Sequence, residues 1–130
     1  MSKLLSRAEV ALENAEHNYR MIHIDDAFLD ACCYDLQQAI ELSLKFLVEM
    51  TGQQYAQNHD IRANMNMLNR VDYHVSYEAE LRNMASTLYS WETETRYKES
   101  FVAVLEDVEN AFVYARAIVQ EARSKIKREN

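Results

Sequence analysis

The chain has 130 residues, with 14 lysines and arginines against 21 aspartates and glutamates and a formal net charge of −7. It contains one glycine and no proline, and because the turns of β-sheets depend on these residues, the composition excludes a β-sandwich, a dinucleotide-binding α/β domain and a glycine-rich phosphate loop. The length is typical of one domain, so we expect a single all-α domain over residues 1–130.

The first two predicted helices follow from apolar residues at helical spacing. Leu5 and Leu12 belong to a stripe that predicts a helix from about residue 2 to residue 21. A second helix is predicted over residues 25–51, with Gly52 as its C-terminal stop. This second helix is apolar nearly all round, which is typical of a central helix covered on more than one side.

A polar, aperiodic loop is predicted next, over residues 53–60. It leads into a short helix whose N-cap is Asn58 or Asp60, both of which are residue types that accept hydrogen bonds from the first helical N–H groups. The inner face of this short helix is predicted to carry Ile61, Met65 and Leu68.

The C-terminal half of the chain predicts two further helices. Residues 69–74 form a connector, a fourth helix covers about residues 76–95, and a fifth covers about residues 99–127. Four long helices and one short helix with short connectors predict an antiparallel up-and-down helical bundle.

A line of polar side chains runs along the otherwise apolar second helix. Its members are Asp35, Gln38, Glu41 and Lys45. Glu41 and Lys45 are four residues apart in the favourable order, so they form an ordinary helix salt bridge on one interpretation. On the other interpretation they bind a ligand, because charges buried in a central helix are destabilising unless they are paired or contact a ligand. The sequence leaves both interpretations open.

Cellular location and metal binding are constrained by what the sequence lacks. No apolar run is long enough to span a membrane, and residues 1–7 lack the layout of a secretory signal, so we expect a cytoplasmic protein. Cys32 and Cys33 are adjacent in an apolar stretch and are predicted to be buried, reduced thiols. The four histidines form no pair at helical spacing, so we expect no metal site and no cofactor.

Three segments resemble a known family when they are taken in order. Residues 33–48, CYDLQQAIELSLKFLV, resemble the second-helix signature of HEPN domains. Residues 58–61, NHDI, and residues 94–97, ETRY, resemble two later segments of the same family. Their order and spacing agree with the family pattern, so the resemblance covers essentially the whole chain.

The resemblance implies a site for a nucleotide or nucleic acid. On the matching positions, its residues are Gln38, Glu41, Lys45, His59, Arg96 and Tyr97. Three departures weaken the match: Asp35 stands where the family often has histidine, Leu42 where it often has lysine, and Lys98 where proline often follows.

Many HEPN proteins are metal-independent ribonucleases that use an Arg-x4–6-His motif, and this motif is absent here. Arg70 and His74 have three residues between them, and Arg20 and His23 have two. Arg82 and the asparagine after it resemble the start of the motif, but no histidine follows at the required spacing. We therefore predict no catalytic residues.

The sequence favours a non-catalytic binding module. The resemblance implies a minimal nucleotidyltransferase as its partner, in an arrangement like a toxin–antitoxin pair. We also expect a homodimer, because the second helix is apolar on more faces than one small bundle need cover and because HEPN domains typically dimerise. The alternatives are a HEPN ribonuclease toxin and a helical scaffold without a ligand.

Overall fold

The computed structural model describes residues 2–94 and 103–129. Within these ranges it contains five helices and no strand, which confirms the predicted all-α fold of four long helices and one short helix. The helices are α1 (Leu4–Arg20), α2 (Ala27–Met50), α3 (Ile61–Arg70), α4 (Glu78–Glu94) and α5 (Leu105–Glu129).

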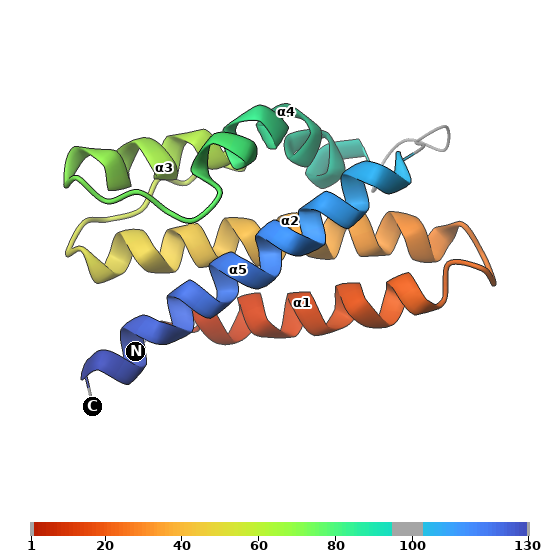
Figure 1. The fold of residues 1–130 in the computed structure, drawn as a ribbon, viewed down its shortest axis with the longest axis horizontal. Coiled ribbons are helices and arrows are strands. Elements are labelled where there is room, and N and C mark those ends of the chain that lie inside the picture. The colour runs from red at the N-terminus through yellow and green to blue at the C-terminus, as the bar shows by residue number, and fades with distance from the viewer. Residues whose placement is uncertain (1, 95–102, 130) are drawn as a thin grey trace.

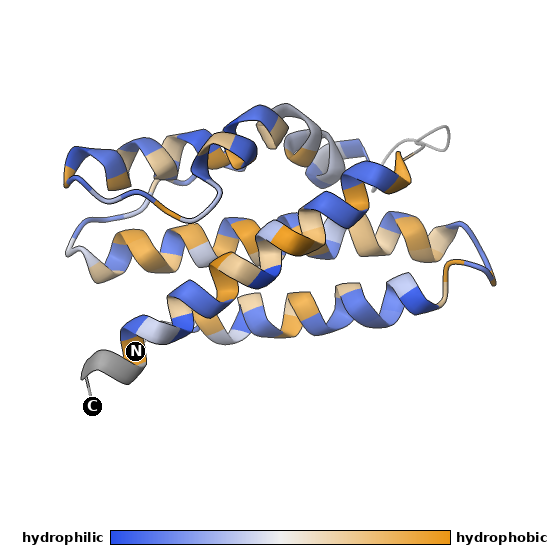
Figure 2. Ribbon diagram, in the orientation of Figure 1, coloured by the Kyte–Doolittle hydropathy of each residue, from blue (hydrophilic) through white to orange (hydrophobic). Residues whose placement is uncertain are grey.

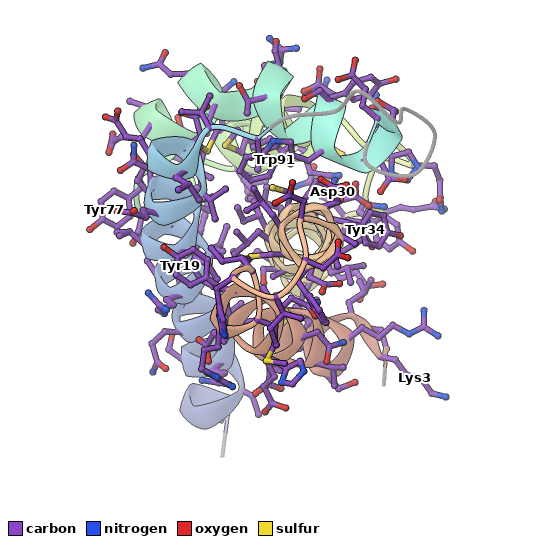
Figure 3. The ribbon with its side chains drawn as sticks, turned by 90° about the vertical axis from the view of Figure 1, so that its right-hand side faces the viewer. Lys3, Tyr19, Asp30, Tyr34, Tyr77 and Trp91 are labelled. Atoms are coloured by element: carbon purple, nitrogen blue, oxygen red, sulfur yellow. The ribbon has the colours of Figure 1, made fainter. Side chains whose placement is uncertain are left out.

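Helix α2 is the centre of the fold. It packs against all four other helices, and Figure 1 shows α1 alongside it, α3 and α4 on the opposite side, and α5 crossing α1 and α2 obliquely. Figure 3 looks nearly along α2 and shows α1, α4 and α5 arranged around it. The position of α2 confirms the expectation drawn from its apolar circumference.

The core follows the amphipathic pattern of the outer helices. Figure 2 shows hydrophobic and hydrophilic residues alternating along α1 and α5, as helices with one buried face require. In α2, every residue from Leu36 to Val48 is buried except Gln38 and Leu42, which are half-buried. A strip of α2 containing these two residues is therefore open to solvent.

The two cysteines of α2 are both fully buried, as predicted. Burial raises the pKa of Cys32 to about 12 and raises the pKa of Cys33 further. Both thiols are therefore protonated at neutral pH and act as small apolar side chains of the core.

The ends of the helices agree with local sequence signals except at α5. Gly52 has φ 85°, the left-handed conformation that ends a helix, two residues after α2. Asp60 is the N-cap of α3, because its carboxylate accepts a hydrogen bond from the N–H of Arg62. Helix α5 begins at Leu105, whereas the prediction placed its start near residue 99. Residues 103–104 are not helical, and residues 95–102 lie outside the described residues.

Helix α5 is tied to two parts of the chain by side-chain contacts. Its Glu121 accepts a hydrogen bond from the hydroxyl of Tyr73 and one from the N–H of Ser76, both in the α3–α4 connector. Its Arg123 pairs with Glu9 of α1, with 2.6 Å between Nε and Oε2. These contacts hold α5 across one face of α1 and α2.

Candidate functional site

A buried carboxylate in the middle of α2 is the centre of a polar network. Glu41 is 3% exposed and accepts three hydrogen bonds: from Gln37 Nε2 at 2.7 Å, from Lys45 Nζ at 3.0 Å and from His59 Nδ1 at 3.0 Å. Lys45 is itself 8% exposed. Because a carboxylate only accepts hydrogen bonds, Nδ1 of His59 is the donor in the contact with Glu41.

A second buried carboxylate joins the network from α4. Glu92 is 7% exposed, and its Oε2 accepts a hydrogen bond from Gln38 Nε2 at 3.0 Å. The same nitrogen donates to Gln37 Oε1 at 2.7 Å, and His59 Nε2 lies 3.9 Å from Glu92 Oε1. The network of Gln37, Gln38, Glu41, Lys45, His59 and Glu92 therefore joins α2, α4 and the 53–60 loop.

Local sequence features place these side chains. Gln37, Glu41 and Lys45 are four residues apart in turn, so they lie on one face of α2. The loop that carries His59 is fixed by Asn64 of α3, which accepts a hydrogen bond from the N–H of Ala56 at 2.8 Å and donates one to its carbonyl oxygen at 3.2 Å. The position of His59 is thus set by its own contact with Glu41 and by the anchored backbone of Ala56, three residues earlier.

The charge balance of the network decides which ligand groups suit it. It holds two carboxylates against one lysine, and that lysine is bonded to Glu41 and lies 5.3 Å from the ring centre of Tyr55. The side chain of His59 is 54% exposed, so this ring connects the buried network to solvent. Such a site suits hydrogen-bond donors, namely amino and hydroxyl groups, better than anions.

The structure brings together four of the six predicted site residues: Gln38, Glu41, Lys45 and His59. Arg96 and Tyr97 lie outside the described residues. Gln37 and Glu92 were missed. Gln37 was detectable, since it stands four residues before Glu41, whereas Glu92 is 54 residues from its partner Gln38 and shows no local signal.

The remaining residue of the predicted polar line faces a different part of the molecule. Asp35 Oδ2 accepts a hydrogen bond from Asn18 of α1 at 2.9 Å, and burial raises its pKa despite that hydrogen bond. Asp35 borders a groove of about 360 Å³ between α1 and α2. The groove is lined by Ser6, Arg7, Val10, Ala11, Asn14, Asp35, Gln38 and Leu42.

The segment that resembles the start of a ribonuclease motif lies on α4. Arg82 is held by Asn69 and Glu78, with 2.9 Å between Arg82 Nη2 and Asn69 Oδ1. The next residue, Asn83, lines a separate cleft of about 240 Å³ between α4 and α5. Glu80 and Asp107 line the same cleft, so it carries two carboxylates.

The family model of the HEPN domain matches residues 1–125. The chain belongs to the HEPN domain family. No curated protein and no solved structure matches it. In this HEPN domain, two of the segments that showed the resemblance, residues 33–48 and 58–61, meet at the polar network. Of the third, only Glu94, the last residue of α4, lies within the described residues.

Membrane-spanning helices and metal-binding clusters are both absent from the described part of this HEPN domain. None of the described helices combines the length and the hydrophobicity that a membrane span requires. No group of three or more histidine, cysteine, aspartate or glutamate side chains there is arranged to hold a metal ion.

Proposed function

We propose that this HEPN domain is a non-catalytic module that binds a nucleotide or nucleic acid and acts with a nucleotidyltransferase-type partner. The observation that carries the proposal is His59, the exposed end of a network of buried polar side chains that suits the amino and hydroxyl groups of a nucleotide. Membership of the HEPN family supports the same conclusion.

The cost of the network favours a binding role over packing alone. Apolar residues of similar volume often stabilise a core as well as a buried ion pair does, or better. This chain nevertheless places Glu41, Lys45 and Glu92 in the interior of a small bundle. The hydrogen bond between His59 and Glu41 orients the His59 ring, and a polar group that is oriented in advance binds a ligand with less loss of conformational freedom.

Two observations favour a binding module over a ribonuclease. Cleavage of RNA places extra negative charge on a phosphate group, which donors and cations must stabilise. Arg82, the arginine of the motif-like segment, is engaged by Glu78 and Asn69. The cleft beside it carries the carboxylates of Glu80 and Asp107, whose charge opposes an RNA backbone.

We also propose that this chain forms a homodimer. In a pair resembling a toxin–antitoxin system, this homodimer would bind the nucleotidyltransferase-type partner. None of the large apolar side chains of α2 is exposed, so α2 does not supply the apolar surface on which the sequence argument relied. Support comes instead from exposed apolar side chains on or beside α4 and α5. These are Tyr77, Tyr89, Val104, Leu105 and Val113.

Calorimetric titration with nucleotides and short single-stranded RNA tests the binding role. We expect the wild-type chain to bind at least one of them, and we expect His59→Ala to weaken that binding. The matched control is His74→Ala, because His74 is also an exposed histidine beside carboxylates but lies on the α3–α4 connector.

Thermal unfolding provides a second measurement of the same binding. A ligand held at 100 times its dissociation constant stabilises a protein by about 2.7 kcal/mol. No response to any nucleotide or RNA would favour the ligand-free scaffold. Robust RNA cleavage that disappears in His59→Ala would favour the ribonuclease.

A further inference from the structure

The groove between α1 and α2 changes in character along its length. Asn18 of α1 is bonded to Asp35 of α2, so in this antiparallel pair Asn14 lies near the level of Gln38 and Val10 near that of Leu42. Arg7 lies at the opposite end from Asp35. The groove is therefore polar at one end, apolar in the middle and cationic at the other end.

The polar side chains of the groove have hydrogen-bonding capacity to spare. Within the described residues, the side chains of Arg7 and Asn14 make no hydrogen bond or ion pair, and only Oδ2 of Asp35 accepts one. Gln38 uses its amide nitrogen in the polar network, and no described group donates to its carbonyl oxygen. Donors and acceptors thus face the groove without partners in the described part of the chain.

The apolar middle of the groove is also accessible. Val10 is 54% exposed, Leu42 is half-buried, and the buried Ala11 also lines the groove. A volume of about 360 Å³ lies within the usual range for small-molecule sites.

We propose that this groove binds a nucleoside monophosphate. The edge of the base lies against Asn14, Asp35 and Gln38, the body of the nucleoside covers Val10 and Leu42, and Arg7 binds the phosphate. Asn14 and Arg7 are seven positions apart, which is about 10 Å along a helix and matches the length of such a ligand. This inference rests on the proposed nucleotide-binding function and names a ligand class for the groove, which meets the polar network at Gln38.

The charges around the groove assign the phosphate to Arg7 rather than to Lys45. The ammonium group of Lys45 is bonded to Glu41 and nearly buried, whereas the guanidinium group of Arg7 is exposed and its planar fork suits phosphate. At the other end, the carboxylate of Asp35 accepts hydrogen bonds but donates none. It therefore favours a base that carries an amino group.

Calorimetry with AMP, adenosine and UMP tests each part of the proposal. We expect AMP to bind more tightly than adenosine, and UMP, whose base lacks an amino group, to bind about fivefold or more weakly than AMP. Arg7→Gln is expected to weaken AMP binding by about tenfold and to leave adenosine unchanged. Arg20→Gln is the matched control, since Arg20 is also an exposed arginine of α1 without a partner in the described part.

A substitution that fills the groove tests the location itself. Val10→Trp is expected to weaken both AMP and adenosine by about tenfold or more, and because Val10 is exposed, its circular dichroism and melting temperature should stay at wild-type values. Val71→Trp, at an exposed valine at the C-terminal end of α3, is the control.

The outcomes separate this inference from the proposed function. Equal AMP affinity in wild type, Val10→Trp and Arg7→Gln would overturn the groove site while the binding module stands. A wild-type chain that binds RNA but none of the three small ligands would likewise overturn the groove site alone. Absence of binding to nucleotides and RNA alike would overturn both.

Discussion

Glu41 accepts hydrogen bonds from three side chains, so its removal affects more than one contact. We expect Glu41→Ala to lower the free energy of unfolding by about 3–5 kcal/mol, because it leaves the buried ammonium group of Lys45 without its partner. Urea denaturation followed by circular dichroism measures this change. Glu13→Ala, at an exposed glutamate of α1, is the control, and a change below about 0.5 kcal/mol is expected there. Equal changes in the two variants would contradict the central role of Glu41.

Ser43 shows the opposite situation on the same helix. Its hydroxyl oxygen is buried and has no hydrogen-bond partner in the described part of the chain. An unpaired buried hydroxyl is destabilising, and alanine is a better helix former than serine. We expect Ser43→Ala to raise the free energy of unfolding by about 1 kcal/mol, measured by urea denaturation. A loss of stability would show that the hydroxyl has a partner.

Asp35 provides a test based on pH. Burial raises its pKa, so the folded state holds the proton more tightly than the unfolded state does. Asp35 therefore contributes stability below the pKa of an unfolded aspartate, about 3.9, and this contribution is lost as the pH rises through the raised folded-state pKa. We expect Asp35→Asn to melt at a higher temperature than wild type at pH 7.

The melting temperatures at low pH complete this test. Below about pH 4 the wild-type carboxyl is itself protonated, so the difference between Asp35→Asn and wild type should shrink. A difference that is constant across pH would contradict the assignment to Asp35.

Sequence reasoning recovered the local part of the site but not the part contributed from a distance. Glu41 and Lys45 are one helical turn apart, and the histidine of the NHDI segment was recognised through the family resemblance. Glu92 joins them only because α4 packs on α2, and the spacing of residues along one helix contains no information about that contact.

At the scale of a helix, α3 shows how strongly one residue defines an element. Asp60 caps the helix, and loss of such a cap costs about 1 kcal/mol. We expect Asp60→Ala to lower the free energy of unfolding by about this amount at pH 7. Asp60→Asn is the matched control, because asparagine also caps helices. Urea denaturation measures the free energy of unfolding of Asp60→Ala and of Asp60→Asn.

The same residue gives a second dependence on pH, with the opposite sign to that of Asp35. The side chain of Arg62 lowers the pKa of Asp60 by hydrogen bonding, and the backbone N–H of Arg62 adds to this effect. The resulting stability is present above the pKa of an unfolded aspartate and is lost as the pH falls through the lowered folded-state pKa. The stability gap between wild type and Asp60→Asn should therefore close in acid.

The boundaries of the helices were predictable where a specific residue sets them. Gly52 allows the positive φ that ends α2, and Asp60 provides the cap of α3. The start of α5 was misplaced because Glu99 and the residues after it continue a helix-compatible pattern, and no capping residue marks Leu105 as the first helical residue.

At the scale of the whole molecule, the central position of α2 was predictable because its apolar residues cover its full circumference. The oblique course of α5 (Figure 1) was not. It depends on contacts between distant residues, such as the bonds of Glu121 to the α3–α4 connector.

The assembly state is the prediction that belongs to this scale. We expect light scattering at micromolar concentration to give twice the 15.2 kDa of one chain. Replacing the exposed Leu105 and Val113 by glutamate should shift the mass toward that of one chain if α5 forms the interface. A single-chain mass for the wild type would contradict the homodimer.

The burial of Trp91 makes the site observable without a label. It is the one tryptophan of the chain, is 2% exposed, and lies between α4 and α2 (Figure 3), next in sequence to Glu92. An indole in such an apolar environment emits at shorter wavelength than one in water. Intrinsic fluorescence therefore reports on the contact between the two helices that carry the network, and a ligand that tightens or loosens this contact should change the emission of the unmodified protein.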